Sequence, residues 1–326
     1  MSNPIFDVIH AATAIHRLAR WQGTLNEQVQ HRYKLLIEEL VAKALVLVDD
    51  VTPPTTVATM IWATAKLWAK VPATQQLMPL LVDAAQWMAT SFKEQEMANI
   101  VWSAAHLRHE APQLSSVIPA VMQPLICQVE GLKPQEAANV IWAAAVLRDE
   151  LPEMKQHVPL LMDAFANKIE AAKPQEIANS VWAAGMLQLR GTQVDKFTQA
   201  ALTKATHDLS WFKPQELANL CRGLALRSYS NVTFMTSLSS TVLQSLPTWS
   251  SKEVSLDLTE ILWSLARLGL RDHQLVAKSS ERVLPHLNHM SDGPICATAW
   301  YLKRLDPEGK LGKFKSEVDQ RVVSRG

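Results

Sequence analysis

A tryptophan recurs in similar sequence surroundings along most of this 326-residue chain. The first four members of the series are 40 residues apart, and the last two continue it less regularly: Trp62, Trp102, Trp142, Trp182, Trp263 and Trp300. Two sets of prolines share the 40-residue period: Pro72, Pro112 and Pro152, and Pro79, Pro119 and Pro159. Three sequence positions with one period indicate stacked repeats, each of which buries its hydrophobic face only against its neighbours.

Each repeat has the pattern of two helices. Lys133-Pro134-Gln135-Glu136 opens the first, because proline suits the first helical position and Glu136 then faces the positive end of the helix dipole. A second helix with one apolar face is expected from near Pro159 to about Ile169. First helices are expected near residues 5–20, 54–68, 94–109, 134–149, 174–188, 214–228, 254–268 and 292–304. The sequence therefore predicts an all-α fold, a right-handed α-solenoid of about eight antiparallel helix pairs with a period near 40 residues.

The ends of the chain depart from the repeat, as expected where terminal repeats cap a stack with a polar face. Residues 1–51 are predicted to form an irregular N-terminal cap, with a long second helix near 26–48. Residues 52–290 hold the helical-pair repeats, and residues 291–326 are predicted to form a C-terminal cap. No low-complexity linker interrupts the chain, so we expect a single domain over residues 1–326.

Composition and motifs exclude several classes of protein. Lys plus Arg is 32 and Asp plus Glu is 31, which excludes a strongly basic domain but permits a local basic stripe. Cys127, Cys221 and Cys296 lack the spacing of a disulfide framework or a zinc site. No phosphate-binding loop, GxSxG or HExxH motif occurs, so we expect no enzyme activity, no cofactor and no metal. No charge-free apolar run of membrane-spanning length occurs, so no membrane insertion is expected.

The tryptophans lie in the most apolar part of each first helix, beside alanines that allow close helix approach. We interpret them as core residues, and we expect no base stacking, which needs exposed aromatic faces. Arg222 takes the place of one tryptophan, and a charged side chain in a core needs a partner or a route to water. With Cys221 and Gly223 beside it, we expect a bend or looser packing, and a guanidinium that reaches solvent or an acidic neighbour.

The repeated stretches read KEQEMANIVWSAAHL from Lys93, KPQEAANVIWAAAVL from Lys133, KPQEIANSVWAAGML from Lys173 and KPQELANLCRGLAL from Lys213. Together with the period, they resemble the octotricopeptide repeat and the helical repeats of organellar proteins that carry RAP domains. The resemblance is best over residues 93–228 and looser over 52–92 and 250–305. It implies an α-solenoid that binds single-stranded RNA in a mitochondrion or chloroplast and acts in RNA stability, processing or translation. Too few residues follow Leu305 for a RAP-like domain, so nuclease activity is not expected.

Two basic rows are candidates for phosphate contact. The first row is Lys93, Lys133, Lys173 and Lys213, one at the start of each helix. The helix dipole disfavours a lysine there, so the row needs another explanation. Either the lysines bind phosphate, or duplication of the repeat copied a residue whose side chain extends into solvent. A second row lies near the helix C-termini, where the dipole already favours a cation: Lys66, Arg108, Arg148, Arg190, Arg227, Arg267 and Arg304. The candidates for RNA-phosphate binding are Lys93, Lys133, Lys173, Lys213, Arg108 and Arg148.

Two rows of amides precede the tryptophan position, and the two rows lie one turn apart on the same helix face. The base-facing candidates are Gln95, Gln135, Gln175, Gln215, Asn99, Asn139, Asn179 and Asn219. Such amides can bind the edges of unpaired bases. Because the asparagines hardly vary, a ladder bonded to the neighbouring repeats is the alternative explanation. Variable positions one turn after the tryptophan are better placed for discrimination: Lys66, His106, Val146, Met186, Leu226 and Arg267.

Two functions remain open from the sequence. In the first, the solenoid binds single-stranded RNA on an organellar transcript, as the lysine row and the resemblance indicate. In the second, it is a structural scaffold that binds protein subunits of a large organellar complex such as a ribosome, where it would also touch ribosomal RNA. The near-zero net charge and the uniform asparagine row favour this second function.

Overall fold

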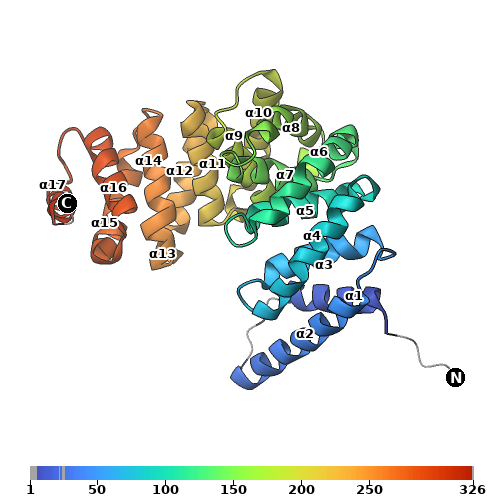
Figure 1. Cartoon of the computed structure of the whole chain (residues 1–326). Coiled ribbons are helices and arrows are strands. Elements are labelled where there is room, and N and C mark those ends of the chain that lie inside the picture. The colour runs from blue at the N-terminus through green and yellow to red at the C-terminus, as the bar shows by residue number, and fades with distance from the viewer. Residues whose placement is uncertain (1–5, 22, 24–25, 325–326) are drawn as a thin grey trace. The chain divides into compact units, whose positions relative to one another are not determined.

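The computed structural model describes residues 6–21, 23 and 26–324, which form helices and connecting turns without a β-strand (Figure 1). Helices follow one another in pairs, and each first helix packs against the first helices next to it within a unit. The predicted all-α solenoid of helix pairs is confirmed. The expected start of the first helix at residue 5 lies outside the described residues.

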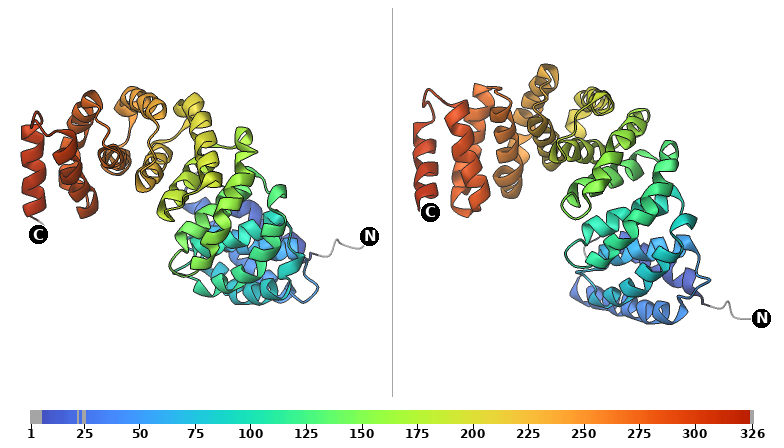
Figure 2. Two further views of the ribbon diagram at one scale, coloured as in Figure 1. Left: turned by 90° about the horizontal axis from the view of Figure 1, so that it is seen from above. Right: turned by 45° about the horizontal axis from the view of Figure 1, so that its top comes forward.

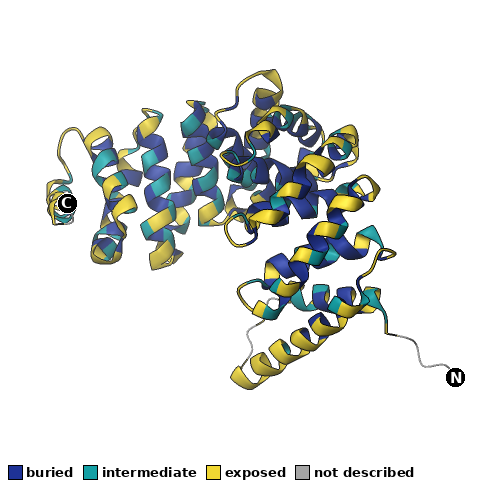
Figure 3. Cartoon of the chain, in the orientation of Figure 1, coloured by how far each residue is buried: buried dark blue, intermediate teal, exposed yellow. Residues whose placement is uncertain are grey.

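The chain divides into two compact units, residues 1–157 and 158–326. In unit 1, the first helices pack in the order of the chain: α1 (Val8–Arg20), α3 (Pro54–Leu67), α5 (Glu94–His106) and α7 (Pro134–Val146). Behind them lie the second helices α2 (Glu27–Leu47), α4 (Met78–Trp87) and α6 (Ile118–Cys127). Helix α2 matches the predicted long second helix near 26–48, and much of its surface is exposed (Figure 3).

In unit 2, a layer of first helices again packs in chain order (Figure 2). Its members are α9 (Pro174–Met186), α11 (Pro214–Arg227), the run α13 (Ser251–Glu253), η9 (Val254–Leu258) and α14 (Thr259–Arg267), and α16 (Asp292–Leu305). The second layer contains α8 (Val158–Ala166), α10 (Thr192–Asp208), α12 (Val232–Ser245) and α15 (His273–Val283). Helix α17 (Gly312–Val323) packs on α16.

The second helices are shorter than expected, because 3-10 turns flank them. The segments η1 (Pro72–Leu77), η3 (Pro112–Val117) and η5 (Pro152–His157) each begin at a proline of the first set. Helix α8 ends at Ala166, before the expected Ile169, which begins the 3-10 turn η6 (Ile169–Ala171). The proline period therefore marks tight turns as well as helix starts.

A buried glutamate caps the first helices. The carboxylates of Glu96, Glu136 and Glu176 accept the backbone N–H of the lysine three residues earlier, at 2.8–3.0 Å. This contact is the glutamate half of a capping box, since a lysine side chain has no acceptor to complete the other half. Glu96 also accepts the hydroxyl of Thr55 on the preceding first helix, at 2.6 Å, so the cap joins neighbouring repeats.

Small residues bring first helices very close together in unit 2. A Cβ added at Gly185 would lie 2.6 Å from the Cα of Gly223, and one added at Gly223 would lie 2.2 Å from the carbonyl oxygen of Val181. Cys221 beside them is fully buried. The expectation of looser packing around Arg222 is wrong, because Gly223 permits a closer helix contact there instead of weakening the helix.

We expect Gly223→Ala to lower the free energy of unfolding by about 1–3 kcal/mol, the usual cost of overpacking a tight contact. The new methyl group would have to displace the Val181 backbone. Gly293→Ala on α16 is the matched control, because a Cβ there meets no atom within 4 Å. Thermal unfolding followed by circular dichroism compares the two, and a Gly223→Ala variant as stable as the control would contradict the close helix contact.

Candidate nucleic-acid interface

Each first helix leaves one stripe of its surface open. On α5 the stripe consists of Gln95, Asn99, Trp102 and His106, which are half-buried or exposed, whereas residues 96–98, 100–101 and 103–105 are buried. Spacings of four, three and four residues place the four side chains on one helix face. We call the stripes of each unit the tryptophan face of that unit. The equivalent residues are Thr55, Thr59, Trp62 and Lys66 on α3, Gln135, Asn139, Trp142 and Val146 on α7, Gln175, Asn179, Trp182 and Met186 on α9, Gln215, Asn219, Arg222 and Leu226 on α11, and Leu256, Glu260, Trp263 and Arg267 on η9 and α14.

The six repeat tryptophans are half-buried, so the prediction that they belong to the core is wrong. Alanine and aliphatic residues fill the buried positions around them, such as Ala104 and Ala105 beside Trp102. Neighbouring first helices lie too close for an indole between them, and the ring lies at the open edge of the contact. A helix that is apolar on nearly every side does not reveal from sequence which side stays open.

The tryptophans of neighbouring repeats contact one another. In unit 1 the ring centroids of Trp62 and Trp102 are 6.5 Å apart, and those of Trp102 and Trp142 are 6.4 Å apart. In unit 2 the rings of Trp263 and Trp300 lie 5.8 Å apart. Unit 1 therefore carries a row of three rings across α3, α5 and α7, and unit 2 carries one pair of rings across α14 and α16.

Cations lie over these rings. The ammonium of Lys66 is 4.4 Å from the ring centroid of Trp102 and 5.7 Å from that of Trp62. The guanidinium of Arg304 lies 3.7 Å from the ring of Trp300, and those of Arg222 and Arg267 lie 5.1 and 5.5 Å from Trp263. Such cation–π contacts contribute about 0.5–2 kcal/mol each and place positive charge along the aromatic row.

His106 completes the surroundings of Trp102. Its imidazole stacks on the indole at 4.7 Å with an interplanar angle of 15°. Burial, and then the charge of Lys66, lower the pKa of His106. Burial, and then the charge of Lys70, lower the pKa of Lys66. The lowered pKa favours a neutral imidazole at neutral pH, so His106 adds an uncharged ring to this part of the face.

The two amide rows lie on one helix face, as the sequence predicted, and the tryptophans lie on that face as well. The four glutamines are exposed and the four asparagines are half-buried. The side-chain amide of Asn219 donates to the side-chain oxygen of Asn179 at 3.3 Å. The alternative of an asparagine ladder is therefore confirmed between α9 and α11. The polar groups of Asn179 and Asn219 that this bond does not use remain on the tryptophan face.

Lys93, Lys133, Lys173 and Lys213 are exposed and occupy the N-cap positions of their helices. The glutamates accept hydrogen bonds from the backbone N–H groups of these lysines. The capping contact therefore explains why a glutamate is needed, but it does not explain why the N-cap residue has a lysine side chain. The ammonium of Lys133 lies 4.0 Å from the carboxylate of Glu136, which is a long contact. Phosphate binding by the lysines stays a prediction.

The two arginine candidates contact helix ends. Arg108 donates to the carbonyl oxygen of Val146 at 3.0 Å and to the imidazole of His109 at 2.9 Å. Arg148 donates to the carbonyl oxygen of Ala145 at 3.0 Å. These bonds satisfy C-terminal carbonyl groups that a helix leaves without partners, and both guanidinium groups stay half-exposed. Their phosphate contact also stays a prediction.

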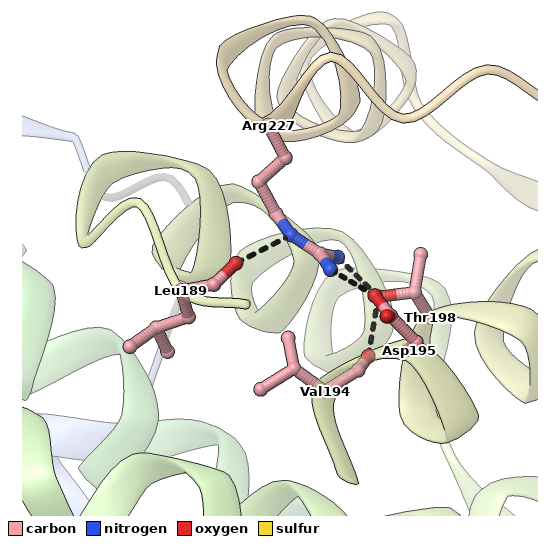
Figure 4. A network of polar contacts seen from close by, with 5 residues as sticks. All are labelled: Leu189, Val194, Asp195, Thr198 and Arg227. Carbon is pink, nitrogen blue, oxygen red and sulfur yellow. Dashed lines mark hydrogen bonds and ion pairs between the residues drawn. The ribbon is translucent and has the colours of Figure 1, made fainter. Parts of the chain in front are cut away.

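Arg227 belongs to the same basic row but is buried, with 4 % of its surface exposed (Figure 4). It donates to the carbonyl oxygen of Leu189 at 2.9 Å and to the hydroxyl of Thr198 at 2.6 Å, and it pairs with Asp195. Thr198 in turn donates to the carbonyl oxygen of Val194 at 2.7 Å. Arg227 therefore ties α11 to α10, and the expectation that it could contact a ligand is wrong.

A groove of about 500 Å³ opens on the tryptophan face of unit 2. Arg222 lies in it, forms an ion pair with Glu260 and covers one side of Trp263. The predicted acidic neighbour of Arg222 is therefore confirmed. Asp257 and Thr259 also line the groove, at and after the π-helical turn η9.

Sequence reasoning missed this part of the groove. It placed the helix start near residue 254, whereas the helix begins at Ser251 behind a Ser250–Glu253 capping box. That box, and the departure of Trp263 from the 40-residue spacing, were the signals that this helix is longer and irregular. The π-helical turn that the irregularity produces could not be read from periodicity.

Asp257 lies in unfavourable surroundings. Burial, and then the charges of Glu253 and Glu260, raise the pKa of its carboxyl group to about 6. Among the residues that the structure describes, no group donates a hydrogen bond to this carboxylate. At neutral pH the protein therefore holds a half-buried negative charge that the charge of Lys252 offsets only in part.

We expect Asp257→Asn to be more stable than the wild type at pH 7, with a melting temperature a few degrees higher. The pKa of Asp257 is raised from its ordinary value of 3.8 to about 6 in the folded protein. The stability that Asp257 contributes is therefore fully present below pH 3.8 and is lost as the pH rises through about 6. Melting curves at pH 7 and below pH 4 test this, since the gain should vanish in acid. Asp83→Asn, an exposed site on α4, is the control. An equal gain at both pH values would contradict the assignment.

Within the described residues, no helix combines the length and the apolar composition that crossing a membrane requires. The same residues hold no group of three or more His, Cys, Asp or Glu side chains placed to bind a metal ion.

Comparison with known proteins gives one family. Residues 112–306, more than half of the chain, match the family described as the Tbc2 translation factor, N-terminal domain. No curated protein has a sequence that matches this chain.

Proposed function

This chain belongs to the family of the Tbc2 translation factor N-terminal domain, and we propose that it binds single-stranded RNA along the tryptophan face. The observation that carries this proposal is the row of half-exposed indoles with cations over them, flanked by exposed glutamines. The family supports a role in translation. The resemblance of residues 93–228 to the octotricopeptide repeat supports RNA as the ligand and a mitochondrion or chloroplast as the place of action.

The chemistry of the face suits unpaired nucleotides. Bases of a single strand expose flat faces that stack on aromatic and guanidinium planes, and edges that amide groups bind. A duplex buries both features. The lysines at the helix N-termini stand beside backbone N–H groups that also attract anions, so they could hold the phosphates of a strand that crosses the helices.

A protein scaffold is the second candidate. The bond between Asn219 and Asn179 favours it, because an asparagine row that bonds within the protein needs no base. The arginines that bind helix-end carbonyl groups favour it as well. The two candidates differ in whether the isolated chain binds RNA.

Substitution of face tryptophans tests RNA binding. We expect Trp102→Leu and Trp263→Leu each to weaken binding of a short unpaired RNA by roughly 5- to 150-fold, since stacking contributes about 1–3 kcal/mol per base. Trp87→Leu is the matched control, because Trp87 is 75 % exposed on α4, away from the face. Fluorescence anisotropy at fixed salt gives the affinities. Equal effects of all three substitutions would contradict stacking on the face.

Salt dependence tests the lysine row. Each phosphate contact to a single strand contributes about −0.7 to the slope of log K against log salt. We expect replacement of Lys93, Lys133, Lys173 and Lys213 with glutamine to flatten that slope by roughly 2–3 units and to weaken all sequences alike. If RNA still binds with the wild-type slope, the lysines form a solvated edge. If the wild type binds no RNA, the scaffold function replaces the RNA-binding one.

A further inference from the structure

The groove in unit 2 differs from the rest of the tryptophan face. Helix α11 supplies Gln215, Asn219 and Arg222, the π-turn and α14 supply Asp257, Glu260 and Trp263, and α16 closes one side with small residues. Gly293 on that side has open space where a side chain would stand. The volume of about 500 Å³ lies within the range of small-molecule pockets. The groove thus combines an aromatic plane, a cation and acceptor groups in one cavity.

Two polar groups beside the groove lack partners within the described part of the chain. The hydroxyl of Thr259 is buried without a hydrogen bond, and the Asp257 carboxylate receives none. Asp257 lies in the π-helical turn η9, and Thr259 directly follows it. An unsatisfied buried polar group costs about 1–3 kcal/mol, and π-turns occur frequently at functional sites. A ligand that brings N–H donors would offset that cost.

The chemistry of the lining selects among the bases. An ionised carboxylate only accepts hydrogen bonds, so Asp257 needs a base that donates. Guanine presents two adjacent donors, N1–H and the N2 amino group, whereas adenine, cytosine and uracil each present a single donor group there. A guanidinium such as that of Arg222 suits O6 and N7 of guanine. Arg222 lies over the ring of Trp263, so a base would stack on this indole as the guanidinium moves from the ring to the edge of the base.

We propose that this groove is a pocket for one unpaired guanine, with Asp257 on its Watson–Crick edge, Arg222 near O6 and N7, and Trp263 on its face. The inference rests on the proposed RNA binding and deepens it, because it assigns base selectivity to one repeat of the face. Glu260 holds Arg222 in place through their ion pair.

Base analogues test each contact with the full chain. The probes are labelled oligouridine 12-mers with guanine, inosine, 7-deazaguanine or adenine at the sixth position, and plain oligouridine as reference. We expect the wild type to bind the guanine probe roughly 5- to 150-fold more tightly than the adenine probe, the discrimination of a good bidentate contact. Inosine lacks the 2-amino group and 7-deazaguanine lacks N7, so both should bind more weakly than guanine.

Substitutions connect each loss to its residue. Asp257→Asn should remove the difference between guanine and inosine, and Arg222→Gln should remove the difference between guanine and 7-deazaguanine. The affinity of each variant for oligouridine serves as its own reference, so that each loss is read as a change in the ratio between two probes. Asp83→Asn, outside the groove, should leave every difference intact.

The outcomes separate the two proposals. If no probe binds, the RNA-binding function itself is wrong. If oligouridine binds but guanine has no advantage, or if the advantage survives Asp257→Asn, the guanine pocket is overturned and RNA binding stands. The acidic groove would then suit a basic side chain of a protein partner.

Discussion

The close approach of neighbouring first helices is the constraint on which the other features depend. Alanine and glycine at the contact, as at Gly185 and Gly223, leave no room for larger side chains between helix backbones. The indoles are therefore displaced to the open edge, where Trp62, Trp102 and Trp142 lie beside one another, as do Trp263 and Trp300. Tight packing thus produces both the stability of the layer and its aromatic surface.

Positive charge has two separate tasks in a chain that is almost neutral. Arg108, Arg148 and Arg227 satisfy backbone carbonyl groups or hold neighbouring helices together. Lys66, Arg222 and Arg304 lie over indoles instead, and the four row lysines extend from helix starts into solvent. A net charge near zero therefore conceals a face on which cations gather at the rings.

Much of the fold could be predicted because it repeats. Proline, glutamate and tryptophan registers locate the helix pairs, and most helix starts agree with the sequence to within a few residues. The partial exposure of Trp142 could not be predicted, because a helix apolar on nearly every side has no polar face to orient it. The groove depends on one π-helical turn near Asp257, and an irregular turn leaves no periodic trace in sequence. The Ser250 capping box pointed to a longer helix but not to its geometry.

The contact between Gly185 and Gly223 also limits how this protein can change by duplication. The equivalent positions one repeat earlier hold Ala145 and Ala183, so otherwise similar repeats differ where their backbones meet. A copy of the earlier repeat inserted in place of α9 would bring a methyl group against α11, because a Cβ at position 185 would lie 2.6 Å from the Cα of Gly223. These repeats are consequently not interchangeable modules, and an engineered array would have to transfer α9 and α11 together.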